Sequence, residues 1–221
     1  MKKALGLVLG LGLFMGAASL YAAAFEGEVD FSMTTKEGAG TIVYLIKGKQ
    51  FRVDTTYSGQ ESAAIIDSDA GTMTMMMPAQ KMYMSMAIPQ PKTAAAAAAG
   101  QGQLTDTGRF AVILGKKCEE WQYAGKSSTI SLWCAQGMGG FAGLSGKPND
   151  PNAAWAAALK GKGFFPLRIV SKKSDGSVFM SMVATKIAPG TEDASLFQVP
   201  AGYNKIDMGN LGAMMGNQGQ K

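Results

Sequence analysis

Hydrophobic and polar residues alternate along most of the chain. Between Phe25 and Met33 the odd-numbered positions are apolar or glycine, and the even-numbered positions are acidic residues or serine. A period of two is typical of a β-strand with one buried face and one solvated face. This alternation and short β-rich runs predict strands at residues 25–33, 41–46, 51–55, 63–67, 72–77, 82–86, 110–114, 117–123, 128–134, 167–173, 177–187 and 197–200.

Residues 87–108 break the pattern. Prolines, six consecutive alanines and glycines predict a low-complexity insert at residues 89–103 within a single β-rich domain spanning 25–207, followed by a disordered tail at 208–221. Asp150 and Pro151 can begin a short helix that carries Trp155 and Leu159 on one face and ends at Gly161. Strands do not alternate with helices. The fold class predicted is mainly β, a strongly curved antiparallel sheet or half-open β-barrel with one or two short helices.

Methionine is concentrated in one stretch, TMTMMMPAQKMYMSM, where it occupies seven of the fifteen positions from Thr72 to Met86. The central residues 78–81 suit a hairpin turn. Side chains in a strand alternate between faces, so this turn predicts one face made of six methionines. They are Met73, Met75, Met77, Met82, Met84 and Met86.

Three interpretations of this methionine face remain open. Methionine fills irregular cores, since its side chain is flexible. It also suits the wall of a site for apolar ligands of variable shape, which here would continue into Val29 and Phe31. Thioethers also bind Cu(I). The eight residues named are the predicted ligand-binding residues.

The N-terminus has the layout of a secretory signal peptide. Lys2 and Lys3 precede an apolar run of about a dozen residues, and small residues follow up to Ala24. The run is shorter than the roughly 20 residues that span a membrane. We therefore expect residues 1–24 to be a cleaved signal peptide and the protein to be periplasmic and not membrane-spanning.

Charge and composition exclude several classes of function. Removal of residues 1–24 lowers the formal charge from +5 to +3, and basic residues do not cluster, so we expect no nucleic-acid binding. Histidine is absent, which excludes Ser-His-Asp and Cys-His catalysis and every histidine metal site. Glu119 and Glu120 are neighbours on one strand, face opposite sides and are interpreted as solvated charge. No enzymatic activity, metal site or cofactor is predicted.

Cys118 and Cys134 are the two cysteines. An isolated pair in an oxidising compartment usually forms a disulfide. A turn centred on Lys126 would place the two directly opposite each other on adjacent strands. The sequence therefore predicts one structural disulfide.

Several segments resemble an uncharacterised family of exported bacterial proteins, known only as a domain of unknown function. That family is similar to the periplasmic lipoprotein carrier and receptor group (LolA/LolB-like). The resemblance covers about residues 25–207 and rests on the runs 44–54, 77–83, 115–121, 132–134, 163–167 and 196–203. It implies a strongly curved antiparallel sheet around an apolar cavity, with helices near the open mouth. The alanine insert and the Trp155 helix are the candidate lids.

These inferences lead to one hypothesis and two alternatives. We expect a non-enzymatic periplasmic protein that binds an apolar or lipid-like ligand in a half-barrel cavity. The alternatives are a methionine-rich Cu(I)-binding protein and a structural envelope protein without a small ligand. The sequence does not indicate a protein partner.

Overall fold

The computed structural model describes residues 25–88, 102–125, 128–141, 155–156, 158–159 and 161–206. The expected signal peptide, the tail and all but the last two residues of the expected insert lie outside these residues. So do the proposed helix start at Asp150 and Pro151 and the turn at Lys126.

The described elements with continuous bounds are twelve strands and two 3₁₀ turns. In chain order they are β1 (Gly27–Thr35), β2 (Ala39–Lys47), β3 (Gln50–Tyr57), β4 (Gln60–Asp67), β5 (Thr72–Met77), η1 (Pro78–Gln80), β6 (Met82–Ala87), β7 (Gln103–Ile113), β8 (Lys116–Ala124), β9 (Ser128–Gln136), β10 (Phe164–Lys173), β11 (Val178–Pro189), η2 (Ala194–Phe197) and β12 (Asn204–Lys205). The predicted mainly β fold class is confirmed.

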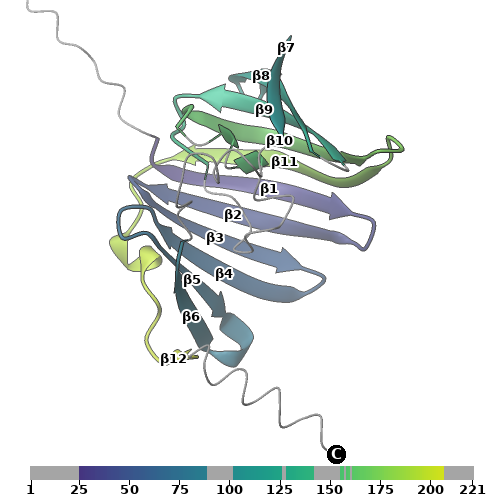
Figure 1. Cartoon of the computed structure of the whole chain (residues 1–221). Helices are drawn as coiled ribbons and strands as arrows, with labels where there is room; N and C mark the ends of the chain where they lie inside the picture. The colour runs from purple at the N-terminus through teal and green to yellow at the C-terminus, as the bar shows by residue number, and fades with distance from the viewer. Residues whose placement is uncertain are drawn as a thin grey trace, which may run out of the picture.

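All twelve strands form one sheet in the order β12-β6-β5-β4-β3-β2-β1-β11-β10-β9-β8-β7. Strands β1–β6 follow one another as the N-terminal meander, and β7–β11 form the C-terminal meander. The two are joined side by side where β1 pairs with β11. Pairing is antiparallel except between β12 and β6. The sheet is curved and not closed, with one edge at β12 and the other at β7 (Figure 1).

The two faces of the sheet bury different groups of residues. The inner face carries the main hydrophobic cluster, which includes Val29, Phe31, Tyr44, Leu132 and Ile169. A second cluster lies on the outer face of the N-terminal meander. There the C-terminal segment around η2 buries Phe197 against Leu45, Ala63, Ile65 and Met76.

Helical backbone is present at residues 155, 156, 158 and 159, and Gly161 follows with a positive φ of 79°. Both Trp155 and Leu159 are buried in the main cluster, as expected for residues on one face of a short helix. The predicted lid candidate at Trp155 therefore packs onto the inner face of the sheet.

Two predicted boundaries are wrong. Residues 197–200 are not a closing strand, because Phe197 ends the η2 turn and β12 begins only at Asn204. Strand β7 begins at Gln103, well before the predicted residue 110, and it includes the last residue of the expected insert. Its irregularity between Asp106 and Phe110 is a β-bulge, which hid the strand because a bulge interrupts the period-two pattern.

Candidate functional site

The methionine hairpin has the predicted register. Met73 pairs with Met86, Met75 with Met84, and Met77 with Met82. The turn is the short η1 segment, which Lys81 ends in the left-handed conformation with its N–H donating to the carbonyl of Pro78. Because paired residues of antiparallel strands share a face, all six methionines lie on the inner face of β5 and β6.

A groove of about 370 Å³ opens on the inner face of the N-terminal meander. Residues from every strand from β1 to β6 line it. They are Met33, Ile42, Val53, Thr55, Ser62, Ala63, Ala64, Ile66, Met73, Met75, Met76, Met77 and Met84. The structure thus brings four of the six predicted methionines into one groove. Met82 and Met86 have the same face but are not part of the lining.

Cross-strand pairing connects the methionines to the rest of the inner face. One row of partners runs from Met75 through Ala64, Val53 and Tyr44 to Val29. The continuous apolar surface expected toward Val29 and Phe31 is therefore present. Both residues are fully buried, however, and neither is part of the groove lining.

An aromatic group covers the inner face beside the groove. The ring of Phe141 stacks on Tyr44, with centroids 5.3 Å apart, and on Trp155, with centroids 5.4 Å apart. Phe165 meets Phe141 edge-on at 5.5 Å. These contacts fill the space over β1, β2 and β10. The groove lies beside this aromatic group, on the methionine side of the inner face.

The groove is almost without polar groups. Thr55 and Ser62 are the polar residues of its lining, and it contains no ionisable side chain. Met75 is 41% exposed, so its thioether is accessible from solvent. No group of three His, Cys, Asp or Glu residues gathers as a metal site in the described parts of the chain. A metal ion in this groove would therefore depend on thioethers alone.

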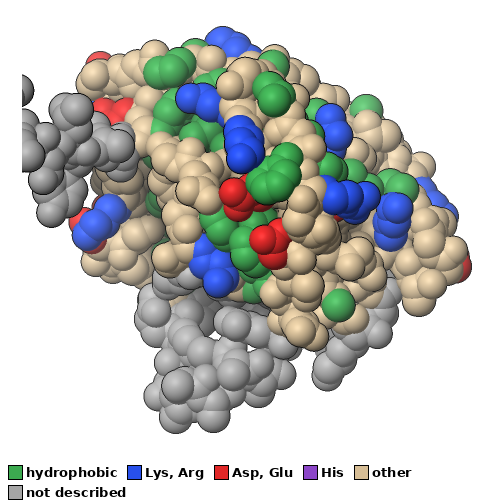
Figure 2. All heavy atoms as spheres, turned by 90° about the horizontal axis from the view of Figure 1, so that it is seen from above, with side chains coloured by type: hydrophobic (Ala, Val, Ile, Leu, Met, Phe, Trp, Pro, Cys, Tyr) green, Lys and Arg blue, Asp and Glu red, His purple; other side chains and the backbone are tan. Residues whose placement is uncertain are grey.

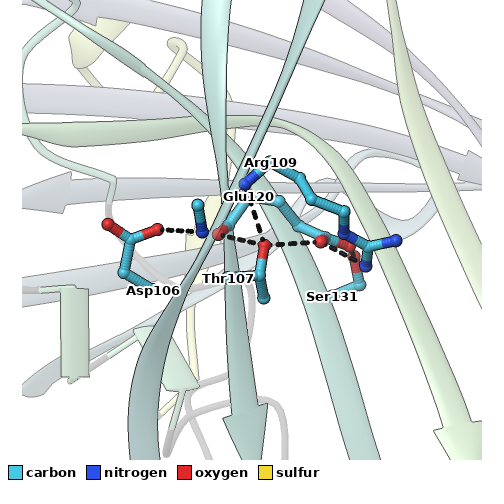
Figure 3. Close-up of polar contacts among 6 residues, drawn as sticks. Asp106, Thr107, Arg109, Glu120 and Ser131 are labelled. Carbon is cyan, nitrogen blue, oxygen red and sulfur yellow. Dashed lines mark hydrogen bonds and ion pairs between the residues drawn. The ribbon is translucent and has the colours of Figure 1, made fainter.

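A second hollow, of about 230 Å³, lies on the outer face of the C-terminal meander beside Glu120. Figure 3 shows the bulged part of β7 folded over this carboxylate. Thr107 Oγ1 donates to one carboxylate oxygen at 2.8 Å, and Ser131 Oγ donates to the other at 2.6 Å. The guanidinium of Arg109 forms an ion pair with it.

The environment of Glu120 keeps it ionised. Burial raises its pKa, but the hydrogen bonds from Ser131 and Thr107 and the ion pair with Arg109 together outweigh burial and hold the pKa below its usual range. The expectation of a solvated charge is wrong, because this residue is only 3% exposed. With these hydrogen bonds and the ion pair in place, the Glu120 carboxylate holds the edge strand β7 against β8 and β9. Because its pKa is lowered, it is a poor proton donor.

The cysteines do not have the predicted register. Cys118 pairs with Ala135, and Cys134 pairs with Glu119. This one-residue difference places the two side chains on opposite faces of β8 and β9. Both are free, buried thiols in the structure, and burial raises the pKa of each. The disulfide is therefore not confirmed.

The sequence matches the model of a family described as a domain of unknown function, DUF4412, over residues 25–203. The chain belongs to this family, and the sequence-based recognition of an uncharacterised family is confirmed. A comparison with curated protein sequences gives no match.

Similar folds occur among solved structures. An uncharacterised conserved protein from Thermus thermophilus is 10% identical, with a TM-score of 0.54 over 82% of this chain and 90% of its own. The protein PNGF-II is 14% identical, with a TM-score of 0.50 over 85% of this chain and 32% of its own. A putative outer membrane lipoprotein-sorting protein domain from Vibrio parahaemolyticus is also among the matches. It is 7% identical, with a TM-score of 0.29 over 76% of this chain and 87% of its own.

Within the described residues, no helix has the length and apolar character needed to cross a membrane.

Proposed function

We propose that this protein is a non-enzymatic, exported binding protein that holds an apolar or lipid-like ligand in the methionine groove. The observation that carries the proposal is a groove of about 370 Å³ lined almost wholly by apolar side chains. Ligand pockets are mostly apolar concavities of this order of size with a few polar groups. Thr55 and Ser62 would supply those polar groups.

The methionines suit such a ligand because of their flexibility. A thioether side chain has several low-energy rotamers and adapts to chains of different shape. The partly exposed Met75 would lie at the entrance, with the less exposed Met73 and Met84 deeper in the groove. The aromatic group around Trp155 lies beside the groove and would limit the length of ligand that fits.

Binding of a fluorescent fatty-acid probe tests the proposal. Ala64 lines the groove between Val53 and Met75, so Ala64→Phe should fill it. We expect probe affinity to fall roughly tenfold or more, which corresponds to about 1.4 kcal/mol or more of binding free energy. The matched control is Ala87→Phe, which adds the same bulk at an exposed position on the opposite face of β6. Equal probe affinity in both variants and the parent would contradict a ligand site in this groove.

A Cu(I) site is the second candidate function, favoured by the register that brings Met73, Met75 and Met84 to one groove. The double variant Met75→Leu/Met84→Leu separates the two functions, because it removes thioethers and retains apolar volume. An apolar-ligand protein keeps its probe affinity in this variant. A copper protein binds Cu(I) tightly in the parent and loses that affinity in the variant.

A further inference from the structure

The two edges of the sheet differ. At one edge β6 is covered by the short parallel strand β12. At the other edge β7 has β8 on one side, and the described residues place no strand on its outer side. Such an edge presents unpaired backbone groups and is a template for another strand.

The exposed hydrophobic side chains concentrate on this edge. Phe110 is 56% exposed, Val112 74% and Leu114 47%, and these three are among only five large hydrophobic residues that are exposed in the described chain. Their spacing of two places Phe110 and Val112 on one face of β7, with Leu114 continuing the series into the turn. Figure 2 shows this end of the molecule, with hydrophobic side chains at the surface among lysines and arginines.

The backbone N–H and C=O groups of β7 that do not pair with β8 belong to the same exposed residues, Phe110 and Val112. Leu114 and Gly115 have φ of 48° and 75° and form the two-residue turn between the paired residues Ile113 and Lys116. In such a hairpin the flanking pair exchanges both hydrogen bonds, and bonded and non-bonded pairs then alternate. Ile113 and Ala111 therefore bond to β8. The N–H and C=O groups of Val112 and Phe110 point to the open side.

Leu114 adds an independent observation. The left-handed conformation at this turn position favours glycine or asparagine and is unfavourable for a bulky side chain. The leucine is also exposed, so it gains little from the core of its own chain. Strained backbone of this kind is often found at residues that make functional contacts.

Charges beside the edge favour a protein strand over a membrane. Lys117 and Glu119 on β8 lie directly opposite Val112 and Phe110. A lipid surface would meet the glutamate together with the apolar side chains. A strand added to β7 would contact the exposed apolar side chains. It would leave Glu119 on β8, while Lys117 reaches over the Phe110 ring, with its Nζ 4.3 Å from the ring centroid.

We propose that the open edge of β7 pairs antiparallel with the same strand of a second copy of this chain, about a two-fold axis at Val112. This register makes the surface self-complementary. Val112 of one chain lies opposite Val112 of the other. Phe110 of each chain lies opposite Leu114 of the other chain. The outward N–H and C=O of Val112 exchange hydrogen bonds with those of its copy. The Cα atoms of Lys117 in the two copies are roughly 14 Å apart, three strand spacings.

The contact is small, with a short strand and three apolar side chains from each copy. Contacts below about 1,200 Å² are weak and transient. Sedimentation equilibrium over a range of concentrations should therefore show a reversible dimer. Val112→Lys should remain a folded monomer, since this side chain is largely exposed. Val178→Lys is the matched control, because Val178 is also an exposed valine, at 47%, but lies on β11 inside the sheet. We expect the control to dimerise as the parent does.

Amide hydrogen exchange locates the contact. At a protein concentration ten times the dissociation constant, about one fifth of the chains remain monomeric, so the Val112 amide should exchange roughly fivefold more slowly than in dilute protein. Ala111 and Ile113 bond to β8 in either state and should show no such change. A parent that stays monomeric overturns the proposal, whether or not it binds lipid vesicles. A dimer without protection at Val112, or one that survives Val112→Lys, also overturns it.

Discussion

The two meanders use the two faces of one sheet in opposite ways. In the N-terminal meander the inner face is partly open at the methionine groove, and the outer face is covered by the segment around η2. In the C-terminal meander the inner face is buried in the main cluster, and the outer face carries a polar hollow around Glu120. An open apolar surface is therefore a local property of this molecule and not a property of the fold.

The physical reason for the difference is what covers each face. Phe141 and Trp155 fill the inner face near β1 and β10, where aromatic rings stack over Tyr44 and Phe165. Over β4 to β6 the described structure places no comparable aromatic cover, and flexible methionines line the space. A rigid, well-packed region thus lies beside an adaptable one on the same face.

Removing the aromatic cover should have the largest effect. Trp155 is fully buried, so Trp155→Ala should lower the free energy of unfolding by about 3–5 kcal/mol. Met75→Ala, at the open groove, should lower it by much less because that side chain is already 41% exposed. Urea denaturation of both variants measures the comparison. Similar losses for the two would mean that the groove is packed like the core.

Removing the charge of the buried Glu120 carboxylate should have the next largest effect on the free energy of unfolding. Glu120→Gln keeps the shape and removes the negative charge that accepts hydrogen bonds from Ser131 and Thr107 and pairs with Arg109. We expect the free energy of unfolding to fall by about 1–3 kcal/mol at pH 7. The folded-state pKa of Glu120 is lowered, so its contribution is present above the unfolded pKa and is lost as pH falls through the folded value.

The difference in stability between the parent and Glu120→Gln should consequently shrink below about pH 4. Denaturant melts at pH 7, 5 and 3 measure it. Glu119→Gln is the control, since this neighbouring residue has none of those contacts. A difference that stays constant with pH would show that Glu120 is not ionised in the folded protein.

Replacing methionine sulfur in the groove should change stability only slightly. The volume-conserving pair Met75→Leu/Met84→Leu should shift the free energy of unfolding by less than about 1.5 kcal/mol. Thermal melts measure the shift. A larger loss would indicate that these side chains pack as closely as those around Trp155.

The smallest expected effect is an increase, not a decrease, in the free energy of unfolding. Leu114→Asn places a residue suited to the left-handed conformation at φ 48°, and it should stabilise the monomer by up to about 1 kcal/mol. The same change should weaken the proposed pairing of β7, because it removes an apolar contact. Urea melts in dilute protein together with sedimentation equilibrium separate the two effects. A loss of monomer stability would mean that Leu114 supports its own fold.

The local features of the structure follow from the amino-acid sequence. Period-two alternation predicted the strands of the N-terminal meander, because side chains of a strand face the core at every second residue. The turn chemistry at residues 78–81 fixed the register of Met73 to Met86, since a short hairpin leaves one alignment of its strands. The methionine face of the groove therefore followed from neighbouring residues alone.

Other features depend on contacts between segments that are far apart in the chain. The pairing of β1 with β11 joins residues far apart in the chain, and no local pattern specifies it. The bulge that folds Thr107 and Arg109 over Glu120 turned an expected solvated charge into a buried one. A shift of one residue between β8 and β9 separated Cys118 from Cys134. Each outcome depends on which element packs over a face, and that depends on long-range contacts that alternation along one strand does not encode.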